Sequence, residues 1–277
     1  MKKVWMITGA ARGLGRAFVE EAVRNGDQVI AALRKVNPED PLFQNENVLT
    51  VFMDVTDKKQ VSEGVAAGLE KFGRIDFLIN NAGFGMNAAF EEIEEDELRT
   101  LFETDYFGLV NVTKAVLPSM RAQKSGRILN ISSQAGLVGG AGCSAYNAAK
   151  FAVVGLSQAL NEEMAPWNIQ VIAVCPGAFR TDFRDGSSMK YVRNPMPEYD
   201  GTPAHNVVQW LRDNNHKQPG DPVKAAAFVY REMMKDSVPR TLILGADCCN
   251  VVRKSLSQTL AEIDSYYEDT AKTAHTD

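Results

Sequence analysis

Cysteine and histidine are scarce and widely spaced in this sequence, which argues against a disulfide framework and against a zinc site. The 277 residues contain four cysteines, at positions 143, 175, 248 and 249, and three histidines, and no C-x-x-C spacing occurs among them. A disulfide-stabilised secreted domain and a zinc site both need denser, regularly spaced ligands. We expect the adjacent Cys248 and Cys249 to be free thiols, and we expect no metal site.

Long apolar runs and blocks of basic residues are also missing. The net charge is −5, and no Lys/Arg block supplies the basic footprint that nucleic acid or an anionic membrane needs. The apolar run before Gly9 is too short for a secretory signal, and no run approaches the roughly 18 residues of a spanning helix. We expect a cytoplasmic protein with a small-molecule ligand and with neither nucleic acid nor membrane as a partner.

The chain does contain a regular alternation of short β-like runs and helical patterns. Such alternation predicts parallel strands joined by helical crossovers, and the length and 45% hydrophobic content suit one large α/β domain over residues 1–277. The fold class is thus a Rossmann-like, doubly wound parallel sheet with helices on both faces. The expected strands are 4–8, 29–33, 48–53, 75–79, 127–131, 169–174 and 241–244, and the expected helices are 13–25, 58–72, 96–120, 145–164 and 222–235.

Residues 181–222 break this rhythm. They are rich in Pro, Gly, Asn and charge, with only short apolar clusters such as 207–211. Long irregular stretches inside compact domains are often lids or binding loops, so we expect a substrate lid here. A polar helical tail is expected at about 248–270.

A glycine-rich loop follows the first expected strand and opens the first expected helix. It reads Thr8-Gly-Ala-Ala-Arg-Gly-Leu-Gly15, with a wider gap between its first two glycines than in G-x-G-x-x-G. A loop at this position can bring its backbone against a pyrophosphate, which then faces the helix N-terminus. A simple tight turn is the alternative. The expected cofactor-binding residues of the loop are Thr8, Gly9, Arg12, Gly13, Leu14 and Gly15.

The residues after the second expected strand favour NADP over NAD. The chain reads Ala-Ala-Leu-Arg34-Lys35 there, with no carboxylate to bind the adenosine ribose. Arg34 and Lys35, with Arg12 of the loop, can meet a 2′-phosphate, although both can equally be solvated surface residues.

Two further segments lie at the ends of expected strands. Asp54 and Val55 follow the third strand, where Asp54 can accept a hydrogen bond from an adenine amino group. Asn80-Asn81-Ala82-Gly83 ends the fourth strand, at the carboxyl edge where doubly wound sheets bind ligands. Either segment can also be an ordinary turn, in which Asp, Asn and Gly are common.

Tyr146 and Lys150 are four residues apart in Ser-Ala-Tyr-Asn-Ala-Ala-Lys, which stacks a phenol and an ammonium on one helix face. A free tyrosine has a pKa of about 10, and a neighbouring cation favours the anion and lowers that pKa. Such a phenol can exchange protons with an alcohol or a carbonyl group.

Together these segments resemble the short-chain dehydrogenase/reductase family, in its compact single-domain branch, over residues 3–245. The resemblance rests on the loop at 8–15, Asp54, Asn80–Gly83, Ser133, Tyr146, Lys150 and the run from Pro176-Gly177 to Thr181. It implies NAD(P)-dependent hydride transfer and frequently a homodimer or homotetramer. It also implies roles: Tyr146 as general acid/base, Lys150 as the residue that binds the nicotinamide ribose and lowers the tyrosine pKa, and Ser133 as the group that polarises the substrate oxygen.

The choice of Ser133 over the adjacent Ser132 rests on the family spacing, and Ser132 is read as a core hydroxyl. The resemblance also implies that Pro176, Gly177, Ala178 and Thr181 pass beside the nicotinamide, with the Ala178 backbone and Thr181 holding its carboxamide.

One residue departs from the family pattern. Where the family usually has an asparagine that holds a relay water, this chain has Asp105, three residues before Gly108. The extra negative charge near Lys150 should partly offset its effect on Tyr146. Asn111 lies six residues further on, about 600° around a helix, so it faces elsewhere and cannot substitute. We expect Asp105 to be tolerated and to alter the pH profile; reduced activity is the competing reading.

The leading hypothesis is an NADP-dependent oxidoreductase acting on a small hydrophobic ketone or alcohol. A nucleotide-sensing protein with weak turnover is the alternative, although a sensor needs only the glycine loop. A hydrolase is excluded by the absence of G-x-S-x-G. Aromatic and methionine residues in 84–90 and 181–215 suggest an apolar substrate wall, or equally the packing of a lid.

Overall fold

The computed structural model describes residues 2–35 and 39–275, so residues 1, 36–38 and 276–277 of the expected domain lie outside the described residues. Its centre is a seven-stranded parallel sheet in the order β3-β2-β1-β4-β6-β7-β9, which confirms the expected Rossmann-like fold. The chain winds outward from β1 to β3 and then restarts on the other side at β4, so the switch point lies between β1 and β4. The strands are β1 Val4–Thr8, β2 Gln28–Leu33, β3 Val48–Phe52, β4 Phe77–Asn80, β6 Gly126–Ile131, β7 Ile169–Pro176 and β9 Thr241–Leu244.

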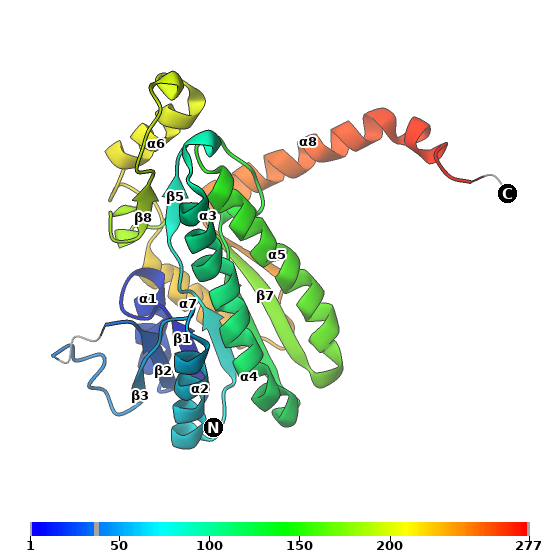
Figure 1. The fold of residues 1–277 in the computed structure, drawn as a ribbon. Coiled ribbons are helices and arrows are strands. Elements are labelled where there is room, and N and C mark those ends of the chain that lie inside the picture. The colour runs from blue at the N-terminus through cyan, green and yellow to red at the C-terminus, as the bar shows by residue number, and fades with distance from the viewer. Residues whose placement is uncertain (1, 36–38, 276–277) are drawn as a thin grey trace.

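Helices cover both faces of this sheet (Figure 1). α1 (Gly13–Arg24) and α7 (Pro222–Met233) pack on one face, and α2 (Lys58–Phe72), α4 (Leu109–Gln123) and α5 (Ser144–Met164) lie on the other. Because both faces are buried, the central strands read as continuous apolar runs, which is why they were recognisable in the sequence.

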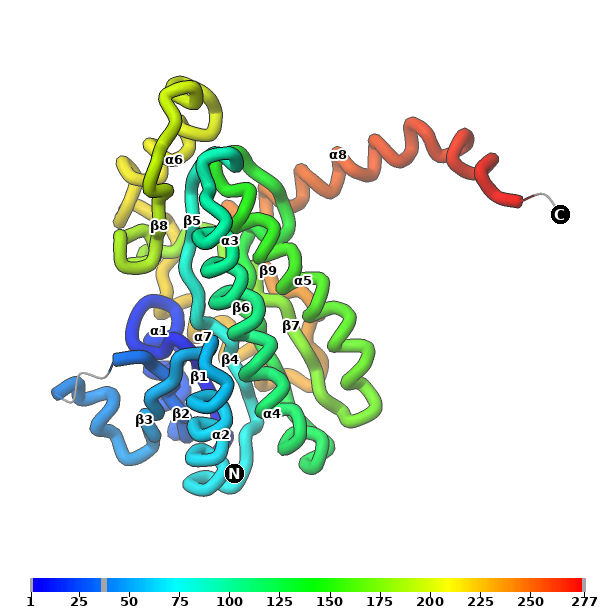
Figure 2. Tube along the Cα trace, in the orientation of Figure 1, coloured from blue at the N-terminus to red at the C-terminus, as the bar shows by residue number. Residues whose placement is uncertain are grey.

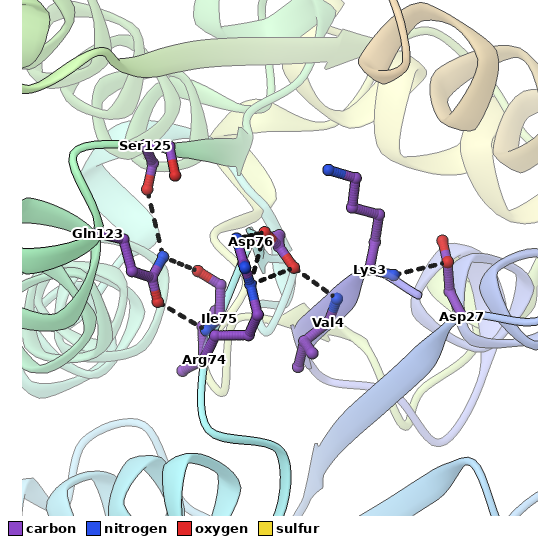
Figure 3. A network of polar contacts seen from close by, with 8 residues as sticks. All are labelled: Lys3, Val4, Asp27, Arg74, Ile75, Asp76, Gln123 and Ser125. Carbon is purple, nitrogen blue, oxygen red and sulfur yellow. Dashed lines mark hydrogen bonds and ion pairs between the residues drawn. The ribbon is translucent and has the colours of Figure 1, made fainter. Parts of the chain in front are cut away.

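A polar network fixes the amino edge of the sheet, opposite the carboxyl ends of the strands (Figure 3). Asp76 accepts hydrogen bonds from the Val4 backbone N–H at 2.9 Å and from the Arg74 guanidinium. Gln123 at the end of α4 pairs with both backbone groups of Ile75. These contacts satisfy buried backbone groups at the edge that carries none of the expected site residues.

The helix expected at 96–120 is interrupted. α3 (Glu95–Phe102) and α4 are joined by a π-helical turn at Glu103–Gly108, which contains Asp105. A π turn adds a residue to the helical repeat and is often found at functional sites. The sequence predicts one continuous helix across this turn, because apolar side chains continue through it at Tyr106 and Phe107.

The segment at 181–222 is more ordered than expected. It contains the strand β8 (Met189–Tyr191), which pairs in parallel with β5 (Gly85–Asn87), and the helix α6 (Pro203–Asp213). Strands of three residues are too short to produce a recognisable alternation. α6 has no fully buried residue, and His205 joins it to the body through Glu92, with 2.7 Å between Nε2 and Oε1.

The last helix, α8 (Ala246–Ala271), begins against the sheet and then leaves the body (Figures 1 and 2). Cys248 and Val252 are its only buried residues among those described, and every described residue from Leu256 onward is exposed. α8 covers the helical tail expected at about 248–270. Within residues 2–35 and 39–275, no helix is both long and apolar enough to cross a membrane.

Candidate active site

Tyr146 and Lys150 lie one turn apart near the start of α5, at the carboxyl edge of the sheet. The Lys150 ammonium lies 5.5 Å from the centroid of the Tyr146 ring. Lys150 is buried and donates a hydrogen bond to the Ile131 carbonyl, at the end of β6, at 3.2 Å. The helical spacing therefore produces the expected juxtaposition of phenol and ammonium.

Asp105 forms a buried ion pair with Lys150. Its Oδ2 lies 3.0 Å from Lys150 Nζ, and its Oδ1 accepts a hydrogen bond from the Phe84 backbone N–H at 2.9 Å. Gly83 leaves room for this carboxylate, since a Cβ there would lie 3.1 Å from Oδ2. Asp105 is thus a direct partner of Lys150, and it ties the π turn to the segment after β4. Asn111 instead donates to the Val55 carbonyl at 3.1 Å, which confirms that it faces elsewhere.

Burial sets the direction of the Tyr146 pKa. It is the largest influence and raises that pKa; Lys150 opposes the rise, while the negative charge of Asp105 adds to it. Lys150 therefore acts in the expected direction, but the net shift of the Tyr146 pKa is upward. Burial opposes ionisation of Lys150, but Asp105 and Tyr146 outweigh it and raise the lysine pKa. The site therefore holds Tyr146 as a neutral phenol beside a charged lysine.

The two serines after β6 have different surroundings. Ser133 caps a short 3₁₀ turn by accepting the Ala135 N–H at 3.1 Å, and its hydrogen bond to Tyr146 favours the phenolate. Ser132 is buried and donates to the Lys150 backbone carbonyl at 2.9 Å. This geometry agrees with the reading of Ser132 as a core hydroxyl and places Ser133 next to the phenol.

The glycine loop has the backbone that an anion site requires. Gly9 and Gly13 have positive φ values of 65° and 57°, which favour glycine. A Cβ on Gly15 would collide with the Gly9 carbonyl and the Asn81 amide. No side chain caps the N-terminus of α1, and its first turn carries no acidic residue. The first amide groups of α1 are therefore available to an anion.

Other expected cofactor residues shape this loop through contacts within the protein. The Thr8 hydroxyl accepts the backbone N–H groups of Asn81 at 2.9 Å and Ala82 at 3.0 Å. The Asn81 side chain donates to the carbonyls of Thr8 and Gly9. These bonds join the ends of β1 and β4 at the switch point.

Arg12 is bound to the lid. Its guanidinium donates to the hydroxyl of Ser187 at 2.5 Å, to the Ser187 carbonyl at 3.0 Å and to the Ser188 hydroxyl at 2.6 Å. Arg34 and Lys35, which follow β2, are both exposed. Of the three basic residues expected at a 2′-phosphate, Arg12 is thus engaged by the lid, whereas Arg34 and Lys35 are exposed.

The residues after β3 also have local partners. Asp54 Oδ1 accepts the Thr56 backbone N–H at 3.0 Å and the Thr56 hydroxyl at 2.8 Å, while the Val55 carbonyl is held by Asn111. Both of these bonds use Oδ1, so they leave Oδ2 of the same carboxylate for another donor.

The backbone of Ala178 has a partner within the protein on both sides, so only the second lone pair of its carbonyl is left for the expected carboxamide contact. Its N–H donates to Asp247 Oδ2 at 2.8 Å, and its carbonyl accepts the Gly220 N–H at 3.0 Å. In the parallel bridge between Phe179 and Gly220, Gly220 bonds to the backbone of Ala178 and Arg180. The backbone N–H and C=O of Phe179 therefore point away from Gly220. Leu14 lies in the first turn of α1, Pro176 ends β7 and Gly177 follows it, while Thr181 lies beside the glycine loop, with its Cβ 3.5 Å from where a Gly13 Cβ would be.

Sequence reasoning missed the residues whose partners are distant in the chain. Asp247 reaches Ala178 across 69 positions, and Glu92 reaches His205 across 113. Phe183, counted only among a general set of apolar residues, has its ring centroid 6.2 Å from that of Tyr146. A carboxylate in the first turn of a tail helix is a weak signal, because it also reads as dipole stabilisation.

Comparisons with known proteins agree with this geometry. A family profile described as short chain dehydrogenase matches residues 3–191. The chain is 40% identical to Oxidoreductase BOA17 of Botryotinia fuckeliana, over 97% of this chain and 98% of that protein. A crystal structure of a short-chain dehydrogenase from Streptomyces avermitilis matches with a TM-score of 0.92 and 38% identity, over 99% of this chain and all of that one. ElxO with NADP bound matches with a TM-score of 0.71 and 27% identity, over 88% of this chain and 97% of that one.

Proposed function

Because this chain belongs to the short chain dehydrogenase family, it is an NAD(P)-dependent oxidoreductase, and we propose that it uses NADP(H) to interconvert a hydrophobic carbonyl compound and its secondary alcohol. The observation that carries the proposal is the cluster of Tyr146, Lys150 and Asp105 beside Ser133. This cluster lies at the same edge of the sheet as the uncapped start of α1.

The residues present fit a dinucleotide. The free amides of the first turn of α1 and the positive-φ glycines suit a pyrophosphate, with Gly15 allowing its close approach. Asp54 Oδ2 suits an adenine amino group. Lys150 has three N–H donors, of which two are directed to Asp105 and Ile131, so one remains for a ribose hydroxyl.

The preference for NADP rests mainly on Arg34. An exposed guanidinium directly after β2, with Lys35 beside it and no carboxylate in place of either, suits a 2′-phosphate. Arg12 can contribute only if it leaves Ser187 and Ser188. The NADP complex of ElxO supports the same assignment by analogy.

The proton chemistry follows from the state of Tyr146. When bound, the nicotinamide supplies or accepts a hydride at the substrate carbon. In reduction, the neutral Tyr146 hydroxyl donates its proton to the substrate oxygen, and Lys150 stabilises the phenolate left behind. The Ser133 hydroxyl accepts the Ala135 N–H, and it can turn its own proton from Tyr146 to the same substrate oxygen. In oxidation the Tyr146 phenolate removes the alcohol proton, and the raised pKa makes this direction the more demanding one near neutral pH.

An apolar substrate is favoured by the side chains near the phenol. The rings of Phe183 and Tyr146 are neighbours, and Met189 of β8 packs so closely on Gly85 of β5 that a Cβ at Gly85 would overlap the Met189 side chain. Phe183 also lies beside Gly85, so these residues place apolar side chains on the lid side of Tyr146. The proposed substrate is therefore a small hydrophobic ketone or alcohol.

A nucleotide sensor with weak turnover is the second candidate. The observation in its favour is the Asp105 carboxylate, which shares the charge of Lys150 and adds to the burial that raises the Tyr146 pKa. Such a protein would bind the nucleotide without efficient proton transfer.

The test is the oxidation of NADPH with a panel of apolar ketones, followed by absorbance. Tyr146→Phe is the matched variant, because it removes one hydroxyl and leaves the glycine loop unchanged. We expect turnover that Tyr146→Phe reduces by at least about a thousandfold, since it removes the proton donor, with NADPH affinity unchanged. Tight NADPH binding with no turnover on any substrate would support the sensor instead.

A further inference from the structure

The outer part of α8 carries a stripe of exposed apolar side chains. Leu256, Leu260, Ile263 and Tyr267 are 60%, 61%, 38% and 61% exposed. They lie on a helix that projects from the body, where no other described segment packs against it (Figures 1 and 2). We call these four residues the α8 stripe.

An unpacked helix of this kind needs a partner. Most helical stability in proteins comes from the packing of an amphipathic face rather than from helix propensity. α8 is packed only through Cys248 and Val252 near its start. The α8 stripe is therefore a candidate protein–protein contact surface.

The spacing of the stripe identifies the kind of partner. The intervals from Leu256 to Leu260 to Ile263 to Tyr267 are those of a heptad seam, which packs against a second helix. The order of intervals reads the same in both directions. Two copies of α8 running antiparallel would thus place Leu256 opposite Tyr267, and Leu260 opposite Ile263, in both halves of the pair.

The charges of α8 favour the same antiparallel arrangement. Arg253 and Lys254 lie before the stripe, and Glu268 and Asp269 lie at its end. An antiparallel pair brings the basic end of one helix beside the acidic end of the other, twice by symmetry. A parallel pair would place like charges together at both ends.

We propose that the α8 stripe is a homodimer interface, in which α8 of one copy packs antiparallel on α8 of a second copy about a two-fold axis near residues 261–262. This surface lies outside the Tyr146 site, and its test does not depend on the proposed reaction. The stripe supplies the buried seam and the end charges set its direction.

The first experiment compares the solution mass of the full chain, by light scattering, with that of Leu260→Gln/Ile263→Gln. Glutamine keeps the helix propensity and removes the apolar seam. Gln258→Ala/Ser265→Ala, on the opposite face of α8, is the matched control. We expect the seam variant to have half the mass of the wild type, whichever other faces also associate, and the control to keep the wild-type mass. Circular dichroism and melting of the body check that the variants are folded.

The second experiment tests the direction of the pair. Arg253→Glu/Lys254→Glu makes both ends acidic and should weaken self-association by at least about tenfold in an antiparallel pair. Adding Glu268→Lys and Asp269→Lys to the same chain should restore it. A parallel pair would be unaffected by the first change. A monomeric wild type, or a mass that the seam variant leaves unchanged, would overturn the proposal and assign the stripe to a different partner.

Discussion

Replacing Asp105 by Asn should release Lys150 to act on Tyr146 alone. In the structure the carboxylate lies 3.0 Å from Lys150 Nζ and adds to the upward shift of the Tyr146 pKa. The substitution keeps the size of the side chain and removes its charge. We therefore expect the pKa of Tyr146 to fall, and both limbs of the pH–rate profile that depend on it to move to lower pH.

The magnitude is limited by the attraction that Lys150 can exert. At an effective dielectric constant of about 20, a charge 5.5 Å from the phenol ring contributes about 3 kcal/mol to phenolate stability, roughly a hundredfold in population. Asp105 cancels only part of this, so we expect the Asn variant to hold about tenfold more phenolate at a given pH. Alcohol oxidation below the pKa should rise, and carbonyl reduction at alkaline pH should fall.

The substitution should also reduce stability. Asp105 accepts from Phe84 on one oxygen and faces Lys150 with the other, whereas an amide must turn its NH₂ toward one of these two donors. The unsatisfied contact should cost about 1–3 kcal/mol, seen as a lower melting temperature.

The assay is an ultraviolet difference titration of tyrosinate, in which Tyr146→Phe identifies the signal of this residue. Glu103→Gln is the control, because it removes an exposed charge from the same π turn without touching Lys150. If Asp105→Asn leaves both the titration and the pH–rate profile unchanged, then Asp105 does not share the charge of Lys150 in solution and the reasoning is refuted.

Three further outcomes are expected. Gly15→Ala should weaken NADPH binding by at least about a hundredfold in calorimetry, because its Cβ would displace the Gly9 carbonyl from the phosphate loop; unchanged affinity would show that the loop adapts. Arg34→Ser should raise the Kd for NADPH by about tenfold to a hundredfold and leave that for NADH unaltered, and an equal loss for both would contradict a 2′-phosphate contact. The pKa of His205 is raised by its hydrogen bond to Glu92, so its stabilisation of the lid is fully present below the ordinary value of about 6.5 and disappears as pH rises through the raised value. His205→Gln should abolish this pH dependence of lid proteolysis, and a variant that keeps it would point to a different group.

The sequence was informative where structure follows from local or periodic patterns. The parallel sheet could be predicted because its strands are buried on both faces, and the Tyr146–Lys150 contact because helical spacing alone produces it. The π turn around Asp105 escaped prediction, since apolar side chains continue through it at Tyr106 and Phe107. Arg12 and Ala178 are expected at the cofactor, but their partners within the protein, 175 and 69 positions away, could not be predicted. Contacts between residues so far apart in the sequence form only in the complete fold, so local patterns do not predict them.

The bond between Ala178 and Asp247 makes the root of α8 part of the catalytic edge. Asp247 Oδ2 holds the backbone that follows β7, and a Cβ on Gly177 or Gly245 would overlap the same carboxylate. A chain shortened before Asp247 would therefore lose the support of this segment along with the tail, whereas one shortened after Val252 would keep it. Shortened chains that differ by these six residues, less than two turns of helix, should behave as two different proteins, and the shorter cannot serve as a tail-free version of this enzyme.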